Sequence, residues 1–186
     1  MPGRDIFVQS WYQGGISVVD ITDPAHPVEI AFFDRGPSVA DKLGDGGHWS
    51  SYWYNGHIYG SEILRGLDVL ELVPTAQLSK NEIEAAKLVQ VTELNVQAQQ
   101  RIVWRPSFVV ARAYLDQLGR RRGLAGGVIK RVSTDLAAAE RLTGTAQLSA
   151  LAKIATRLDG VSAKAADPRR VEALTRVVRG LEGKTS

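Results

Sequence analysis

The stretch SWYQGGISVVDITDPAHPVEIAFF, residues 10–33, decides the fold of the first part of the chain. Apolar and polar residues alternate at a period of two on both sides of a segment rich in Asp and Pro. This alternation predicts two short strands, 16–21 and 28–33, that are joined by a turn. A strand, a turn and a second strand so close to the start indicate a meander of hairpins.

The turn inside this stretch is expected to be stiff because of its composition. Asp20 and Asp23 can accept hydrogen bonds from backbone amides of the turn. Pro24 and Pro27 fix φ and prevent the strands from continuing through the turn. These four residues are therefore interpreted as structural.

Working outward, the same period predicts six strands, at 5–12, 16–21, 28–33, 49–54, 57–63 and 67–72. The glycine pair 14–15 and the dipeptide Asn55-Gly56 suit two-residue hairpin turns, and Arg65-Gly66 can serve similarly. Adjacent antiparallel pairing is the simplest topology. A further strand is possible at 87–94.

The composition excludes several classes of chemistry. The 186 residues contain no cysteine, which rules out disulfides, thiolate zinc sites and a cysteine nucleophile. Hydrophobic residues make up 44% of the chain, which is enough for a buried core. MPGRDIFVQS at the start has no export-signal pattern, and no apolar run reaches the roughly 18 residues of a membrane span.

Charge divides the chain into two differently built parts. Residues 1–75 carry 4 Lys and Arg against 10 Asp and Glu, whereas residues 76–186 carry 19 against 10. Three of the four Trp lie before residue 55, and Ala and Leu dominate after residue 107. The predicted organisation is a β domain at 1–94, a linker at 95–106 and a helical domain at 107–186.

Helical patterns follow the strands. Ser79 and Glu82 form a capping-box pattern, which predicts a short helix at about 79–87. Apolar residues spaced by three and four predict four further helices: one from the N-cap Ser107 to Gly119 or Gly123, then 126–142, 145–158 and 167–181. Each helix must bury its apolar stripe, so an antiparallel bundle is expected. The predicted fold class is α+β, an antiparallel β meander followed by a helical bundle.

Two segments, GGISVVDITDPAHPVEIAFF (14–33) and GGHWSSYWYNGHIYGSEILRGLDVLEL (46–72), carry a family resemblance. Both place a glycine ahead of an apolar strand with a central Asp, Asp20 in one and Asp68 in the other. They resemble the repeats of LVIVD-type β-propeller proteins, whose units read glycine, apolar strand, D-I-[ST]-[DN]-P-x-x-P and second strand.

The resemblance implies partial propeller blades: the last three strands of one blade and the first three of the next, with an α-helical C-terminal extension. It implies a non-enzymatic binding or structural module from the C-terminal part of a longer protein that is extracellular or on the cell surface. A blade needs four strands. Exposed strand edges then predict protein partners, through self-association or through the missing blades.

The densest aromatic cluster is the candidate binding surface, since Trp and Tyr combine large rigid area with a polar group. Its residues are Trp11, Tyr12, His48, Trp49, Trp53, Tyr54 and His57. The alternative is that these side chains pack between neighbouring sheets without any ligand.

Two other functions stay open. A metal-dependent or hydrolytic enzyme could use His48, His57 and Glu62, but no zinc-binding spacing or serine elbow accompanies them, so no catalytic residue, metal or cofactor is assigned. GRRRG at 119–123 could bind nucleic acid or another anionic polymer, although basic residues also favour solvated helix ends.

Overall fold

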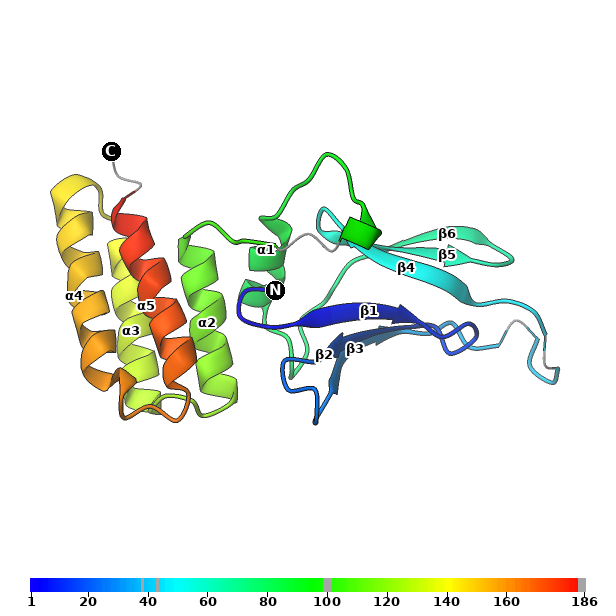
Figure 1. Ribbon diagram of the computed structural model, residues 1–186, viewed down its shortest axis with the longest axis horizontal. Coiled ribbons are helices and arrows are strands. Elements are labelled where there is room, and N and C mark those ends of the chain that lie inside the picture. The colour runs from blue at the N-terminus through cyan, green and yellow to red at the C-terminus, as the bar shows by residue number, and fades with distance from the viewer. Residues whose placement is uncertain (38, 43, 99–101, 184–186) are drawn as a thin grey trace. The chain divides into compact units, whose positions relative to one another are not determined.

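The computed structural model describes residues 1–37, 39–42, 44–98 and 102–183. The chain forms two compact units, Gly3–Ile102 with Met1 and Val103–Ser186 with Pro2. We call them the β unit and the helical unit and describe each by itself. The predicted α+β class is confirmed, because the described residues form two antiparallel three-stranded sheets followed by five α-helices (Figure 1).

The first sheet is an antiparallel meander in the order β1-β2-β3. Its strands are β1 (Ile6–Ser10), β2 (Ile16–Asp20) and β3 (Val28–Phe33). Val18 pairs with Val8 on one side and with Ala31 on the other, and a bulge follows at Val19. The three predicted strands are confirmed to within two residues at each end.

The second sheet has the same topology in the order β4-β5-β6. Its strands are β4 (His48–Tyr54), β5 (His57–Glu62) and β6 (Gly66–Leu70). Gly60 pairs with Ser51 on one side and with Asp68 on the other, and the register shifts between His48 and Ser50. This shift changes which residues of β4 share a face.

The hairpin turns differ from one another. Asn55 and Gly56 both have positive φ, 47° and 94°, as a two-residue turn between β4 and β5 requires. The two-residue turn predicted at residues 14–15 is wrong, because Trp11 N donates to Gly15 O at 2.9 Å and leaves three residues in the loop. Gly15 has φ 77°, and a Cβ there would lie 2.0 Å from the carbonyl oxygen of Phe33.

The two sheets pack face to face inside the β unit (Figure 1). A Cβ on Gly60 of β5 would lie 2.7 Å from Cδ1 of Ile16 in β2, so backbone of one sheet lies against side chains of the other. The buried core joins both sheets to the segment that follows them. Its members are Ile16, Val18, Ile30, Ile58, Leu72, Leu78 and Ile83.

Helix α1 (Lys80–Lys87) begins with the predicted capping box. Ser79 Oγ accepts from Glu82 N at 3.2 Å, and Ser79 N donates to Glu82 Oε2 at 2.8 Å. The possible strand at 87–94 is not formed. Val91 N donates to Asn55 Oδ1 at 2.8 Å and Asn55 Nδ2 donates to Val91 O at 2.9 Å, so the main-chain groups that would pair with a neighbouring strand are already bonded. The short helix η1 (Val96–Ala98) follows.

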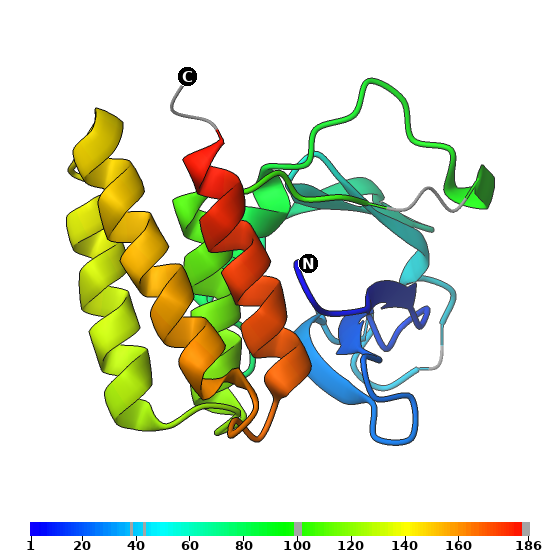
Figure 2. The same cartoon turned by 60° about the vertical axis from the view of Figure 1, so that its left-hand side comes forward.

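The helical unit is a four-helix bundle in which consecutive helices run antiparallel (Figures 1 and 2). Its helices are α2 (Phe108–Arg120), α3 (Gly126–Ala139), α4 (Gly144–Ser162) and α5 (Pro168–Glu182). Helix α5 also packs on α2, which closes the bundle. The predicted stripes meet in one buried cluster that includes Ala111, Leu115, Leu118, Val132, Leu136, Leu151, Ile154, Leu158, Val171, Leu174, Val178 and Leu181.

Helix ends depart from the predicted positions in three places. Helix α4 continues to Ser162, four residues past the predicted end at 158, because Val161 extends the apolar stripe that packs on the bundle core. Helix α2 continues to Arg120 and ends in a Schellman arrangement, where Gly123 N donates to Leu118 O at 2.8 Å and Arg122 has φ 53°. Helix α3 ends at Ala139, three residues early, where the Gln147 side chain caps the carbonyl at 3.1 Å. None of the described helices has the length and apolarity that crossing a bilayer requires.

Candidate functional site

The structure spreads the seven residues of the predicted aromatic surface over different parts of the β unit. Trp53 packs against the core between the sheets, and His48 is buried. Trp11, Tyr12 and Trp49 are exposed. We call the face of each sheet that points away from the other sheet its outer face.

The outer face of the first sheet carries exposed aromatic side chains. Ser17 lies between the core residues Ile16 and Val18, so it points to the outer face. Phe32 pairs with Ser17 and is 73% exposed. Trp11 lies on the same face, because its Nε1 donates to Ser17 Oγ at 3.0 Å. Phe7, opposite Val19, is also exposed.

The outer face of the second sheet is apolar as well. Tyr52, Tyr59 and Val69 are aligned across its three strands, and Leu67, two residues before Val69, is 64% exposed. Tyr54 lies two residues from Tyr52 on the same face, and its ring is 6.1 Å from that of Tyr59. A pocket here is lined by Tyr52, Tyr54, Tyr59, Leu94 and Val96.

The two sheets are also linked by main-chain hydrogen bonds at the β1–β2 hairpin. Tyr12 N donates to His48 O at 3.2 Å, and His48 N donates to Tyr12 O at 2.9 Å. The Tyr12 ring meets Trp49 edge to face at 5.8 Å. Gly47 must be a glycine, because a Cβ there would lie 2.0 Å from the Tyr12 carbonyl.

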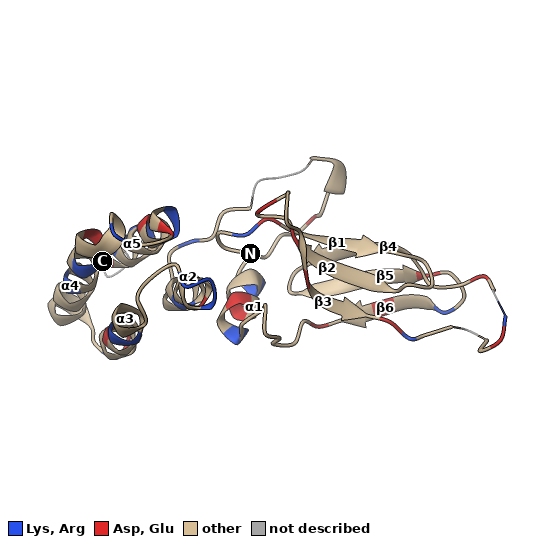
Figure 3. Ribbon diagram, turned by 90° about the horizontal axis from the view of Figure 1, so that it is seen from below, with Lys and Arg blue, Asp and Glu red and all other residues tan. Residues whose placement is uncertain are grey.

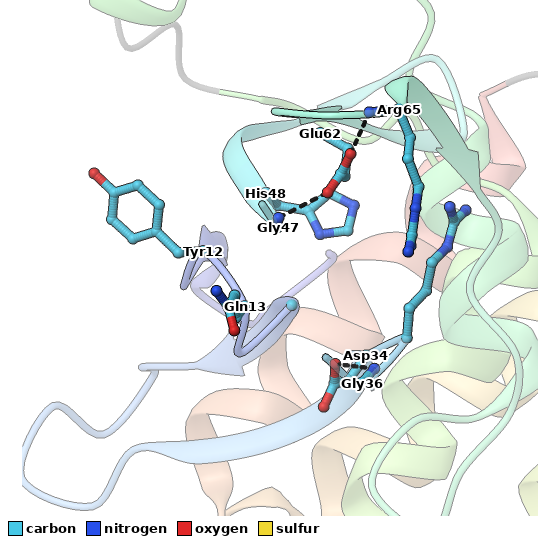
Figure 4. A pocket seen from close by; sticks show the side chains of 10 residues that line it. Tyr12, Gln13, Asp34, Gly36, Gly47, His48, Glu62 and Arg65 are labelled. Atoms are coloured by element: carbon cyan, nitrogen blue, oxygen red, sulfur yellow. Dashed lines mark hydrogen bonds between the residues drawn. The ribbon is translucent and has the colours of Figure 1, made fainter. Parts of the chain in front are cut away.

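Beside this link, the side chains of His48, Asp68 and Arg35 are connected in series by hydrogen bonds. His48 Nε2 lies 2.9 Å from Asp68 Oδ2, and Arg35 donates to the other oxygen of Asp68. A neutral imidazole that donates from Nε2 leaves Nδ1 as an acceptor, and Nδ1 is buried without a hydrogen-bond partner among the described residues. Figure 4 shows His48 beside Glu62 in the wall of a small pocket, with Gln13 and Asp34 across from them.

Both carboxylate oxygens of Glu62 accept hydrogen bonds from backbone amides. Its carboxylate accepts from Gly47 N at 2.7 Å and from Arg65 N (Figure 4), and also from Leu64 N at 2.9 Å. Burial would raise the pKa of Glu62, but these hydrogen bonds and the Arg65 charge outweigh it and lower the pKa below 4.5. Because both oxygens are used, Glu62 orders two loops and is poorly placed as a general base.

The turn between β2 and β3 is held by its own carboxylates. Asp20 Oδ1 accepts from Thr22 N at 2.9 Å, and Asp23 Oδ1 accepts from Ala25 N at 3.1 Å. Pro24 and Pro27 lie between the two strands that they interrupt. Asp20 and Asp68 are not equivalent: Asp20 ends β2 at this turn, whereas Asp68 lies inside β6 and binds His48.

A buried ion network escaped the sequence interpretation. Arg4 Nε donates to Asp20 Oδ2 at 3.0 Å, while Arg4 Nη1 donates to Glu82 Oε1 at 2.7 Å and to Gln77 O at 3.0 Å. All three charged side chains are buried. The capping box pointed to Glu82, but no local signal marks Arg4.

Among the described residues, no three His, Asp or Glu side chains gather in a way that could hold a metal ion. His57 lies at the other end of β5 from Glu62, roughly 17 Å away along an extended strand. Its Nε2 pairs with Glu71 at 3.1 Å. Of the three residues of the predicted enzyme alternative, His48 and Glu62 therefore lie together in one pocket wall, whereas His57 does not join them.

The chain was compared with protein-family models, with curated proteins and with solved structures, and none of the three comparisons found a match. The two outer faces, with exposed aromatic or aliphatic residues on each sheet, are the candidate binding surface of the β unit. Sequence reasoning missed Phe7, Phe32, Leu67 and Val69. Their signal is that β1, β3 and β6 carry apolar residues at both odd and even positions, which is typical of strands covered on both faces.

Proposed function

We propose that the chain is a non-enzymatic binding and structural module, and that its β unit supplies two successive sheets of an LVIVD-type propeller. The partner of these sheets is a further sheet of the same kind. For the isolated chain, that partner is a second copy. The resemblance of residues 14–33 and 46–72 to LVIVD repeats motivates the proposal.

The observation that carries the proposal is that apolar residues occupy both faces of both sheets. The inner faces bury Ile16 and Ile58, while the outer faces expose Phe32 and Leu67. A terminal sheet of a finished fold normally turns polar residues to water. Contiguous exposed apolar side chains on a sheet favour contact with another surface. Two such faces, pointing in opposite directions, would allow the pair of sheets to stack between two further sheets.

The strand edges support the same function. Each sheet has three strands, whereas a propeller blade has four. β1, β3, β4 and β6 lie at sheet edges, and within the described ranges the isolated bridge between Tyr12 and His48, at the start of β4, is the one further pairing at these edges. An unpaired edge presents free backbone N–H and C=O groups to an incoming strand.

The basic residues of the helical unit give less support to an anionic-polymer binder. Several arginines pair with acids of neighbouring helices: Arg112 with Glu140 at 2.8 Å, Arg157 with Asp135, and Arg179 with Asp159. Figure 3 shows acidic and basic residues on the same helices. This mixture favours charge pairing within the bundle over a uniform basic face.

Analytical ultracentrifugation over a range of concentrations tests the proposal. The wild-type chain is expected to associate reversibly, and Phe32→Ser or Leu67→Ser should each weaken association about tenfold, as loss of a central apolar contact does. Leu142→Ser is the matched control, since Leu142 is an exposed leucine of the helical unit and should leave association unchanged. A chain that stays monomeric up to roughly 1 mM would contradict the proposal.

A further inference from the structure

A pocket opens at one end of the helical unit, where the α2–α3 and α4–α5 connections meet. Its volume is about 710 Å³, within the range of sites that hold one small molecule. Apolar side chains of both connections and of helices α3 and α4 form most of its wall, with two cations beside them. The residues used below are Arg122, Leu124, Val128, Ile129, Val161 and Lys164.

The α2–α3 and α4–α5 connections, which form part of the pocket wall, contact each other directly. Asp167 N donates to Gly123 O at 3.1 Å, and a Cβ on Gly123 would lie 2.9 Å from Cβ of Asp167. Leu124 is buried, and Val128 and Val161 pack against the bundle core. The apolar wall is therefore continuous with the bundle core.

The charge beside the pocket has one sign. Arg122 and Lys164 line it together with apolar and glycine residues, and no carboxylate does. Within the described part of the chain, neither cation has an ion-pair partner. Helix α3 begins at Gly126 in the pocket wall without a side-chain cap, so the positive end of its dipole adds to the potential.

We propose that this pocket binds one medium-chain fatty acid, with its carboxylate at Arg122 and Lys164 and its chain against Leu124, Ile129 and Val161. Two cations without a facing acid select an anionic group. The apolar wall selects a hydrocarbon chain. A concave site of this volume suits a single free molecule, whereas docking on a membrane surface would need apolar side chains that project outward.

Isothermal titration calorimetry of the full chain tests the site with three probes. Decanoate is expected to bind with one-to-one stoichiometry. Decanol, which has the chain without the charge, should bind roughly fivefold to tenfold more weakly. Butyrate, which has the charge without the chain, should bind weakest, because each buried methylene contributes roughly fourfold in affinity.

Variants locate the binding to this pocket. Arg122→Gly removes the guanidinium at a backbone position that glycine prefers, since φ is 53°. Combined with Lys164→Ala, it should weaken decanoate binding about tenfold and leave decanol binding unchanged. Ala166→Trp, at the pocket wall, should reduce the binding of both. Lys153→Ala is the control, because Lys153 is exposed on α4 and does not line the pocket.

Circular dichroism confirms that each variant is folded before its affinity is interpreted. The proposal is overturned if decanoate does not bind, if decanol binds as tightly as decanoate, or if the Arg122 and Lys164 changes leave the affinity intact. Sedimentation with phosphatidylglycerol vesicles provides the competing outcome. Binding to vesicles without binding to decanoate would assign the basic end of the bundle to a membrane surface instead. None of these results depends on self-association of the β unit.

Discussion

Arg4 is the side chain on which the buried charges of the β unit depend. It contacts Asp20 at the end of β2 and Glu82 in the first turn of α1, both of them buried. Arg4→Met would leave two buried carboxylates without their cation, which costs about 3–5 kcal/mol of unfolding free energy. Urea denaturation followed by tryptophan fluorescence measures this loss.

Arg141→Met is the matched control for that experiment. Arg141 is exposed just after α3, so its replacement should change the unfolding free energy by about 0.5 kcal/mol or less. A loss below about 1 kcal/mol for Arg4→Met would mean that the network does not hold the β2 turn to α1.

Acid should weaken the β unit through two carboxylates. Burial would raise the pKa of Asp20, but hydrogen bonds from Thr22 and the Arg4 charge hold it below 3.8, and the pKa of Glu62 is held below 4.5. The unfolded chain therefore binds more protons than the folded chain in acid, so the stabilisation is complete above about pH 5 and is lost as the pH falls below 4.5.

Urea denaturation at pH 6, 4.5 and 3 measures this dependence. A variant that combines Asp20→Asn with Glu62→Gln should start less stable at pH 6 and show a shallower decline on acidification. An equally steep decline in this variant would assign the acid sensitivity to other carboxylates.

At the scale of elements, the packing of the two sheets depends on Gly60. A Cβ at this position in β5 would lie 2.7 Å from Ile16 Cδ1 and 2.8 Å from His48 Cδ2. Gly60→Ala should therefore destabilise the chain by about 1–3 kcal/mol through overpacking. Thermal denaturation monitored by near-ultraviolet circular dichroism measures the effect.

The same substitution at Gly160 gives the control. Gly160 lies inside α4, and nothing is within 4 Å of a Cβ placed there, so Gly160→Ala should stabilise the bundle by up to about 1 kcal/mol. Adding Ile16→Val to Gly60→Ala should recover part of the loss, because it removes one of the two clashing atoms. Equal effects at both glycines would contradict face-to-face packing of the sheets.

At the scale of the whole molecule, the helical unit has a core of its own. The buried cluster of the bundle draws its members from residues 111–181 alone. A fragment of residues 103–186 should therefore fold by itself, with a helical circular dichroism spectrum and one cooperative thermal transition. A fragment that is helical but melts without cooperativity would show that the bundle needs the preceding chain.

Local sequence determined most of the elements and their ends. The alternation in residues 16–33, the Asn55-Gly56 turn and the Ser79 to Glu82 capping box each act over a few residues, so their geometry could be predicted without a partner. The apolar stripes at spacings of three and four likewise specified four helices. Where an interaction joins residues only a few positions apart, the residue types alone are enough to predict the local structure.

Tertiary structure alone decided which side chains are buried and paired. The register shift between His48 and Ser50 places His48 on the same face of β4 as Ser51 and Trp53, where simple alternation would place it on the opposite face. Arg4 pairs with residues that lie 16 and 78 positions away in the sequence. The strand predicted at 87–94 does not form, and the Asn55 side chain binds the main chain of Val91 instead. These outcomes depend on contacts between segments far apart in the chain, and no local pattern of residues encodes them.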